Sequence, residues 1–147
     1  AGLSWITVLK KRENYRAAFH QFDPQAIAQM DAPAIDQLLL NSGIIRHPGK
    51  IAAIIANARA YLEMEAKGED FSQFVWQFVD NVQIVHHYPD YSLAPTTSEQ
   101  AIALSKALKQ RGFKFIGPTI CYSFMQACGL INDHQSNCFC HPDAITR

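Results

Sequence analysis

The chain has 147 residues, of which 48% are apolar and 18% are charged, and its formal net charge is zero. This length fits one domain, and this composition fits a globular protein with a substantial core rather than a disordered chain. A zero net charge argues against a protein that coats nucleic acid by bulk charge. However, no acidic residue lies between Ala101 and Ile131, where Lys106, Lys109, Arg111 and Lys114 occur. We therefore expect a local basic patch that contacts a few phosphates.

The first half of the chain predicts a series of amphipathic helices, because its apolar residues recur at helical spacing. The first predicted helix covers residues 3–16. Asp23-Pro24 and Asp31-Ala-Pro33 mark two further helix starts, with Asp as the N-cap and Pro in the first turn. A long helix is then predicted from Pro48 to near Gly68.

The second half predicts three more helices and a loop over residues 86–95. An apolar stripe from Phe71 to Val82 matches one buried helix face. Thr97 and Gln100 stand at capping-box spacing before a helix that continues to Gly112. Residues 117–129 form the last long helix. We find no alternating strand pattern, so the predicted fold is all-α, a single domain over residues 1–147 with about six or seven helices.

Cysteine usage and hydropathy bear on the cellular compartment. The four cysteines occur only from residue 121 to residue 140, so they cannot link the whole fold as the disulfides of a small secreted protein do. Reduced thiols and a cytoplasmic location are therefore expected. No apolar run approaches the length of a transmembrane helix, so we expect no membrane partner. The chain begins inside an apolar pattern and without Met, which indicates a truncated or processed start.

The turn from Gly43 to Arg46 lies between two predicted amphipathic helices and is similar to the hairpin of helix-hairpin-helix DNA-binding domains. Such a turn exposes backbone N–H groups beside the positive end of the next helix, which suits a phosphate. Arg46, His47 and Lys50 would add positive charge. The alternative is an ordinary helix connection in which Gly43 forms the C-cap.

His134 and Cys138 are four residues apart, a spacing that can direct an imidazole and a thiolate at one metal ion. Structural zinc usually takes four ligands, and only these two have suitable spacing. Cys140 and His141 could complete the set, but four ligands within eight residues would be crowded. The alternative is a hydrogen-bonded His beside a free Cys.

Two other features have more than one interpretation. Trp5 could belong to the core, as most Trp residues do, or it could line a binding site. His86-His87 is interpreted as part of a loop rather than as a metal site, because Asp90 is the only nearby ligand at suitable spacing. The chain contains no P-loop, nucleophile elbow or dinucleotide-binding glycine motif.

Several long segments together resemble one protein family. They are residues 1–16, Gly43-Ile-Ile-Arg-His47, Gly49-Lys-Ile51, and residues 112–138 with Cys121-Tyr-Ser-Phe-Met-Gln-Ala127 and Asn132-Asp-His134. In order and content these segments look like DNA-3-methyladenine glycosylase I. The resemblance is continuous over essentially the whole chain, and its motifs are long enough to be highly specific.

The resemblance implies a diverged all-α member of the helix-hairpin-helix glycosylase group. This family excises 3-methyladenine from alkylated double-stranded DNA by cleaving the N-glycosidic bond, without the catalytic Asp of its relatives. Trp5 matches the Trp of the family's base pocket. Gly2 and Leu3 match the segment that enters the gap left by the flipped nucleotide. We expect a monomer.

The resemblance also implies a structural zinc ion, held by a Cys and a His near the family's N-terminus together with His134 and Cys138. The N-terminal pair, like the family's base-contacting Glu and Tyr, would precede Ala1. We therefore identify no catalytic residue in this chain. Two alternatives stay open: a non-catalytic helix-hairpin-helix module that binds DNA or another partner, and a metal-dependent hydrolase using His134 and Cys138.

Overall fold

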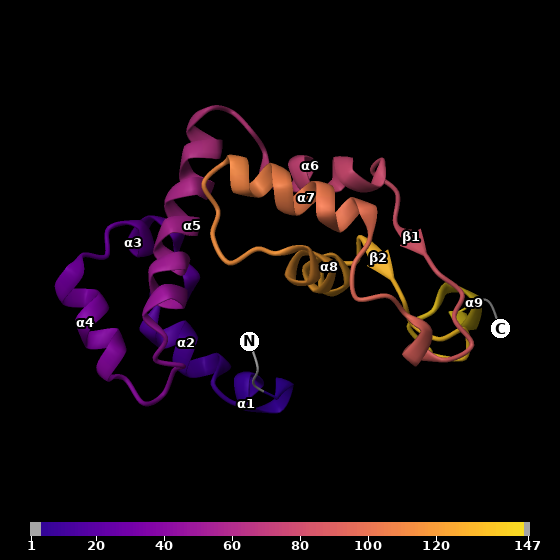
Figure 1. The fold of residues 1–147 in the computed structure, drawn as a ribbon, viewed down its shortest axis with the longest axis horizontal. Coiled ribbons are helices and arrows are strands. Elements are labelled where there is room, and N and C mark those ends of the chain that lie inside the picture. The colour runs from indigo at the N-terminus through magenta and orange to yellow at the C-terminus, as the bar shows by residue number, and fades with distance from the viewer. Residues whose placement is uncertain (1–3, 146–147) are drawn as a thin grey trace. The chain divides into compact units, whose positions relative to one another are not determined.

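The computed structural model describes residues 4–145, which are mostly helical (Figure 1). The predicted all-α class is confirmed. These residues group into two compact units. The first comprises the chain as far as Gly68 together with Gly112–Phe115, and the second comprises Glu69–Arg111 together with the chain from Ile116 onward. No helix in the described part is long and apolar enough to cross a membrane.

The first unit consists of helices connected by short turns. Its elements are α1 (Trp5–Leu9), α2 (Arg12–Ala18), the 3-10 turn η1 (His20–Phe22), α3 (Pro24–Ala28), α4 (Ala32–Leu40) and α5 (Pro48–Ala66). The single helix predicted over residues 3–16 is therefore two helices, which separate at Lys10 and Lys11. Three consecutive β-branched residues in α1 weaken its helix propensity, which is consistent with this early end.

The predicted helix starts are confirmed in detail. The Asp23 side chain accepts a hydrogen bond from the N–H of Gln25, and the Asp31 side chain accepts one from the N–H of Ala34. Each Asp thus satisfies an amide that has no partner within its helix. Pro48 begins α5 and Ala66 ends it, close to the predicted limits.

The core of the first unit lies where α3 and α4 pack against α5 (Figure 1). Its buried residues are Phe19, Ile27, Met30, Leu38, Ile44, Ile51, Ile55 and Ala58. Full burial of each large aliphatic or aromatic side chain contributes about 1.5–3 kcal/mol. The core therefore holds α5 and the turn around Ile44 in a defined arrangement.

The second unit combines helices with one short parallel strand pair. Its elements are α6 (Phe71–Trp76), η2 (Gln77–Val79), β1 (Ile84–Val85), η3 (Tyr91–Leu93), α7 (Glu99–Gln110), α8 (Pro118–Ala127), β2 (Ile131–Asn132) and α9 (Pro142–Ile145). Helix α7 packs against both α8 and η2. The helices α7 and α8 match their predicted limits to within about two residues, whereas α9 is too short to have produced a periodic signal.

Two local predictions in this unit are wrong. The apolar stripe does not continue as a helix to Val82, which is 68% exposed. The chain leaves the helix at Asp80 and Asn81, whose positive φ angles Asp and Asn tolerate better than most residues. The prediction of Thr97 as the cap of α7 is also wrong. The cap is Ser98, which accepts the N–H of Ala101, and Thr97 Oγ1 is buried with no hydrogen-bond partner among the described residues.

The strand pair is a further difference from the prediction, which contained no strand. Ile84 pairs with Ile131 and Val85 with Asn132 in parallel. Two residues per strand are too few to show an alternating pattern, so the sequence carried no signal for them. The pairing matters for the rest of the unit, because it places His86 beside the residues that follow β2.

Candidate functional site

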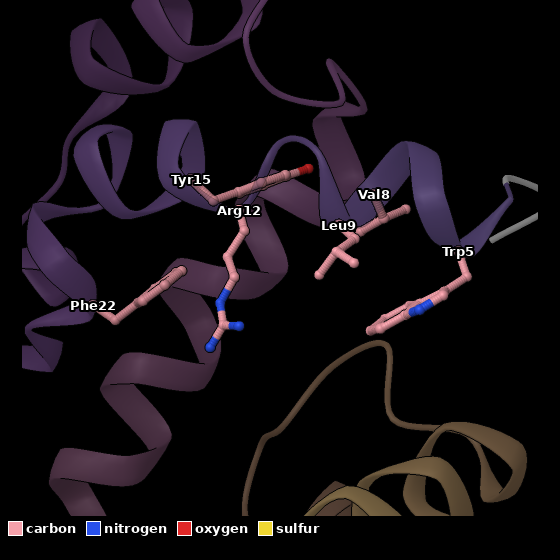
Figure 2. Close-up of a pocket in the computed structure, with 6 residues that line it drawn as sticks. All are labelled: Trp5, Val8, Leu9, Arg12, Tyr15 and Phe22. Atoms are coloured by element: carbon pink, nitrogen blue, oxygen red, sulfur yellow. The ribbon is translucent and has the colours of Figure 1, made fainter.

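Trp5 lines a pocket of about 350 Å³ on the first unit. Figure 2 shows that its side chains come from α1, α2 and η1: Trp5, Val8, Leu9, Arg12, Tyr15 and Phe22. Trp5 is 75% exposed, so the interpretation that Trp5 belongs to the core is wrong. The pocket is of a size typical for small-molecule sites, and aromatic and aliphatic groups form most of it. Its one charged side chain is Arg12.

Tyr15 connects this pocket to the rest of the unit. Its ring stacks on the buried Phe19, with centroids 5.9 Å apart and planes 12° from parallel. Its hydroxyl accepts a hydrogen bond of 3.1 Å from the N–H of Ile45. The pocket wall is therefore fixed to the core on one side and to the turn before α5 on the other. The sequence could not show the hydrogen bond from Ile45 to Tyr15, because no local pattern relates residues 30 positions apart.

Two backbone amides of the turn at Gly43 donate hydrogen bonds to side chains of the protein. The N–H of Gly43 donates to Asn41 Oδ1 at 2.8 Å, and the N–H of Ile45 donates to Tyr15. These two amides are therefore occupied rather than open to a phosphate. The glycine C-cap interpretation is also wrong, because α4 ends at Leu40 with Asn41 as its C-cap. Gly43 is needed for space: a Cβ there would lie 2.9 Å from Asn41 Oδ1 and 3.2 Å from Asn14.

The three basic residues predicted near this turn have different surroundings. Arg46 is exposed, and Lys50 is half-buried. The His47 imidazole caps α5 by accepting the N–H of Lys50 at 3.2 Å, and its ring packs against Phe115 with the two planes 79° apart. His47 is thus engaged in holding the helix start. Gly2 and Leu3 lie outside the described residues.

A second basic surface lies on α7 and α8. A groove of about 510 Å³ is lined by Ile102, Ser105, Lys106, Lys109, Gln110 and Pro118. Pro118 is the first residue of α8, and among the described residues no side chain caps this helix start. The first amides of α8 therefore have no side-chain acceptor, and the positive end of the helix begins at a residue that lines the groove. Arg111, also in the predicted basic stretch, instead pairs with Glu69 and stacks over Phe74.

The C-terminal cysteines and histidines form two separate groups. His134 Nδ1 lies 3.5 Å from Cys138 Sγ. Adjacent N and S ligands of a tetrahedral zinc ion are about 3.5 Å apart, so this spacing fits zinc. Cys140 joins the pair, and the ligand atoms of the three residues lie within 4.8 Å of one another. His141 does not join them, because it is fully buried against the backbone of His86. All four cysteines are free thiols.

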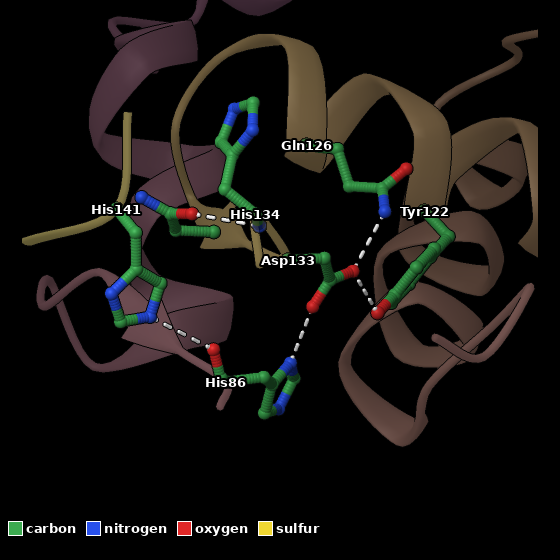
Figure 3. Close-up of polar contacts among 7 residues, drawn as sticks. His86, Tyr122, Gln126, Asp133, His134 and His141 are labelled. Atoms are coloured by element: carbon green, nitrogen blue, oxygen red, sulfur yellow. Dashed lines mark hydrogen bonds and ion pairs between the residues drawn. The ribbon is translucent and has the colours of Figure 1, made fainter. Parts of the chain in front are cut away.

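Asp133 is the centre of a buried polar network that sequence reasoning missed (Figure 3). Its carboxylate accepts hydrogen bonds of 2.6 Å from the Tyr122 hydroxyl, from Gln126 Nε2 and from His86 Nδ1. Burial by itself would raise the pKa of Asp133, but the hydrogen bonds from Tyr122, His86 and Gln126 outweigh it and hold the pKa below its usual value. An ionised carboxylate can only accept, so Nδ1 of His86 carries the proton in this contact.

The Asp133 network also determines the position of His134, one of the candidate metal ligands. Asp133 directly precedes His134, and its three partners come from β1's end and from α8. The hydrogen bonds of the buried Asp133 side chain therefore hold the backbone that leads into His134. His86 uses its Nδ1 on Asp133, whereas the neighbouring His87 belongs to a group of possible metal ligands with His141 and Asp143, which the loop interpretation of His86-His87 did not include.

Known proteins match this chain over nearly its whole length. Residues 1–141 match the family described as methyladenine glycosylase. DNA-3-methyladenine glycosylase 1 of Escherichia coli is 62% identical over 142 residues, which cover 97% of this chain and 76% of that protein. A DNA-3-methyladenine glycosylase of Haemophilus influenzae is 60% identical, with coverage of 95% and 76%.

Solved structures agree with these sequence matches. A crystal structure of a 3-methyladenine DNA glycosylase I aligns with a TM-score of 0.94 at 63% identity, covering 96% of this chain and 78% of that one. A variant of such an enzyme in complex with 3-methyladenine aligns with a TM-score of 0.88 at 43% identity, covering 94% and 74%. From its fold, its exposed indole pocket and these matches, the chain belongs to the methyladenine glycosylase family.

Proposed function

We propose that the protein is a base-excision repair glycosylase that flips 3-methyladenine out of alkylated double-stranded DNA and hydrolyses its N-glycosidic bond. The pocket at Trp5 carries this proposal, because an exposed indole beside aliphatic and aromatic side chains suits a flat base. Relatives that share this fold carry that activity in their names, and one was solved with 3-methyladenine.

Cleavage of this N-glycosidic bond needs little acid catalysis from the protein. A base inside a duplex is out of reach, so the nucleotide must leave the stack. Methylation at N3 places positive charge on the adenine and makes it a good leaving group. The protein then has to select the cationic base and stabilise a sugar with oxocarbenium character while water attacks. An electron-rich indole face attracts a cationic ring by about 0.5–2 kcal/mol, and we assign this role to Trp5.

Arg12 cannot share that role, because its guanidinium is permanently positive and would repel a cationic base. It extends into the same pocket in Figure 2. A positive side chain beside a base pocket suits a phosphate of the flipped nucleotide. We therefore assign Arg12 to the DNA backbone and Trp5 to the base.

Arg12→Gln should accordingly weaken the binding of alkylated DNA but not the binding of the free base. We expect weaker binding to alkylated DNA, with the slope of log K against log salt reduced by about one, because one phosphate contact is lost. Binding of free 3-methyladenine should stay the same or improve. The measurement is a salt titration of DNA affinity beside calorimetry with the free base. Equal losses for both ligands would place Arg12 on the base instead.

Two surfaces are candidates for the remaining phosphate contacts. One is the turn with Gly43, Arg46, His47 and Lys50, where the exposed Arg46 and the half-buried Lys50 supply charge. The other is the groove between α7 and α8 with Lys106 and Lys109. The uncapped start of α8 favours the second surface, because anions bind at free helix amides.

Lys50→Ala should weaken DNA binding and reduce the salt slope by about one if the first surface contacts DNA. The matched experiment is Lys106→Ala on the second surface, measured under the same salt series. An unchanged slope in Lys50→Ala would mean that Lys50 faces away from DNA. A reduced slope in only one of the two variants identifies the phosphate-binding surface.

We also propose that His134 and Cys138 hold a structural zinc ion, with Cys140 available as a further ligand. The 3.5 Å contact between His134 and Cys138 supports this assignment. The resemblance predicts that a Cys and a His preceding Ala1 complete the site. Zinc would then tie the two ends of the chain together and take no part in the reaction.

We infer further that the protein acts on DNA as a monomer. We also infer a cytoplasmic location, which the free thiols support. The alternative of a non-catalytic DNA-binding module is tested by release of free base from alkylated DNA. The assay should compare this chain with a version extended by the N-terminal segment that the resemblance predicts. Chelator added to either version tests the alternative of a metal-dependent hydrolase. Loss of activity without unfolding would support that alternative, and we expect no such loss.

A further inference from the structure

We propose that His87, His141 and Asp143 form a binding site for a divalent transition-metal ion, separate from the group around His134 and Cys138. Their ligand atoms lie within 4.8 Å of one another. His87 belongs to the segment after β1, and the other two residues lie at the start of α9. The site therefore joins two segments that are far apart in the sequence.

The distances suit a metal ion. His87 Nδ1 lies 3.2 Å from Asp143 Oδ2, and His141 Nδ1 lies 3.7 Å from the same oxygen. In a tetrahedral zinc site, neighbouring nitrogen and oxygen ligands are separated by about 3.3 Å. The two imidazole rings are also close, with centroids 4.9 Å apart and planes at 66°. Small side-chain rotations would therefore bring the three ligands around one ion.

A second contact prepares His141 as a ligand. His141 is fully buried, and its Nε2 lies 3.2 Å from the carbonyl oxygen of His86 (Figure 3). A carbonyl can only accept, so Nε2 carries the proton and Nδ1 keeps a lone pair. This is the arrangement in which metal-binding histidines are usually oriented, with the distal N–H donated to a backbone carbonyl. The lone pair now accepts the N–H of Asp143 at 3.2 Å, a long hydrogen bond that a metal ion would replace.

The donor set indicates the kind of ion. Two imidazole nitrogens and one carboxylate oxygen suit zinc, nickel or cobalt better than magnesium or calcium, which prefer oxygen ligands alone. The side chains of His87 and Asp143 are 59% and 50% exposed, so ions can enter and water can complete the coordination. We assign the site a structural role, in which the ion fixes the start of α9 against the segment after β1.

The experiment is a calorimetric zinc titration in a background that lacks the other group: His134→Gln, Cys138→Ser and Cys140→Ser. We expect one zinc ion per chain. Adding either His87→Asn or Asp143→Asn should weaken zinc binding by more than about tenfold, because each removes a direct ligand. His20→Asn, at an exposed histidine of the first unit, is the matched control and should leave zinc binding unchanged. His141 is not a suitable test because its burial makes misfolding the expected result.

Cobalt gives a second measurement of the same site. Bound Co²⁺ in this background should show visible absorption without a thiolate charge-transfer band, and this absorption should disappear from the spectrum of His87→Asn. In the chain with its cysteines intact, His87→Asn should lower the bound zinc by one ion. No zinc uptake in the background variant, or equal affinity with and without His87 and Asp143, would overturn the proposal.

Discussion

Trp5→Ala should weaken the binding of free 3-methyladenine by about 2- to 30-fold, which corresponds to a loss of about 0.5–2 kcal/mol of stacking and cation–π attraction. The effect should fall on binding rather than folding. Trp5 is 75% exposed, so its removal leaves no buried cavity, and surface substitutions of this kind usually change stability by less than about 0.5 kcal/mol. Calorimetric titration with the free base measures the change directly.

Two further variants make the Trp5 result specific. Trp5→Phe keeps an aromatic face of lower electron density and should lose only part of the affinity. Ile6→Ala removes the next side chain of α1, which is also exposed but does not line the pocket, and should have no effect on base binding. Equal affinity of Trp5→Ala and the parent chain would remove Trp5 from the base site.

Asp133→Asn should destabilise the protein by about 3 kcal/mol, the upper part of the range for a buried polar group that loses its partner. Asn has the same shape, but one of its two terminal atoms is an NH₂ group. His86 donates to one carboxylate oxygen, and Tyr122 and Gln126 donate to the other, so the donors on one of these two sides would then face a donor in place of an acceptor. Urea denaturation near neutral pH, with the slope m compared between variants, is the measurement.

Asp80→Asn is the matched control for this substitution. Asp80 is exposed and has a φ of 51°, a conformation that Asn tolerates as well as Asp does. It should change the free energy of unfolding by less than about 0.5 kcal/mol. A similarly small change in Asp133→Asn would mean that the network does not hold the second unit together.

The local parts of this fold could be predicted from sequence because their causes are local. Asp23 and Asp31 act as caps within three residues of their partners, and Pro48 marks a helix start by its own backbone. The wrong prediction of Thr97 as the cap of α7 has an equally local cause. Ser98 is an alternative cap one residue later, and a spacing rule cannot rank two neighbouring hydroxyl residues.

The polar contacts that organise the candidate sites could not be predicted in this way. His86 and Asp133 are 47 residues apart, and a strand pair of two residues each brings them together. The Tyr15 hydroxyl reaches the N–H of Ile45 over 30 residues. No periodicity reports such contacts, because they depend on the packing of whole elements.

The candidate base site was identified through the resemblance rather than through residue patterns. General burial habits favoured Trp5 as a core residue, and the structure places it in an exposed pocket. Arg12, by contrast, carried no signal in the sequence beyond its charge on a predicted helix. Its importance follows from its position next to the indole, which only the fold of α1 and α2 establishes.

The measurement that tests the central claim most directly is the release of free 3-methyladenine from alkylated duplex DNA, followed by chromatography of the liberated base. We predict release by this sequence when the N-terminal segment expected from the resemblance precedes it, and a slower rate in the Trp5→Ala variant of the same protein. DNA binding without any release of base from the extended protein would contradict the glycosylase assignment and leave a DNA-binding module in its place.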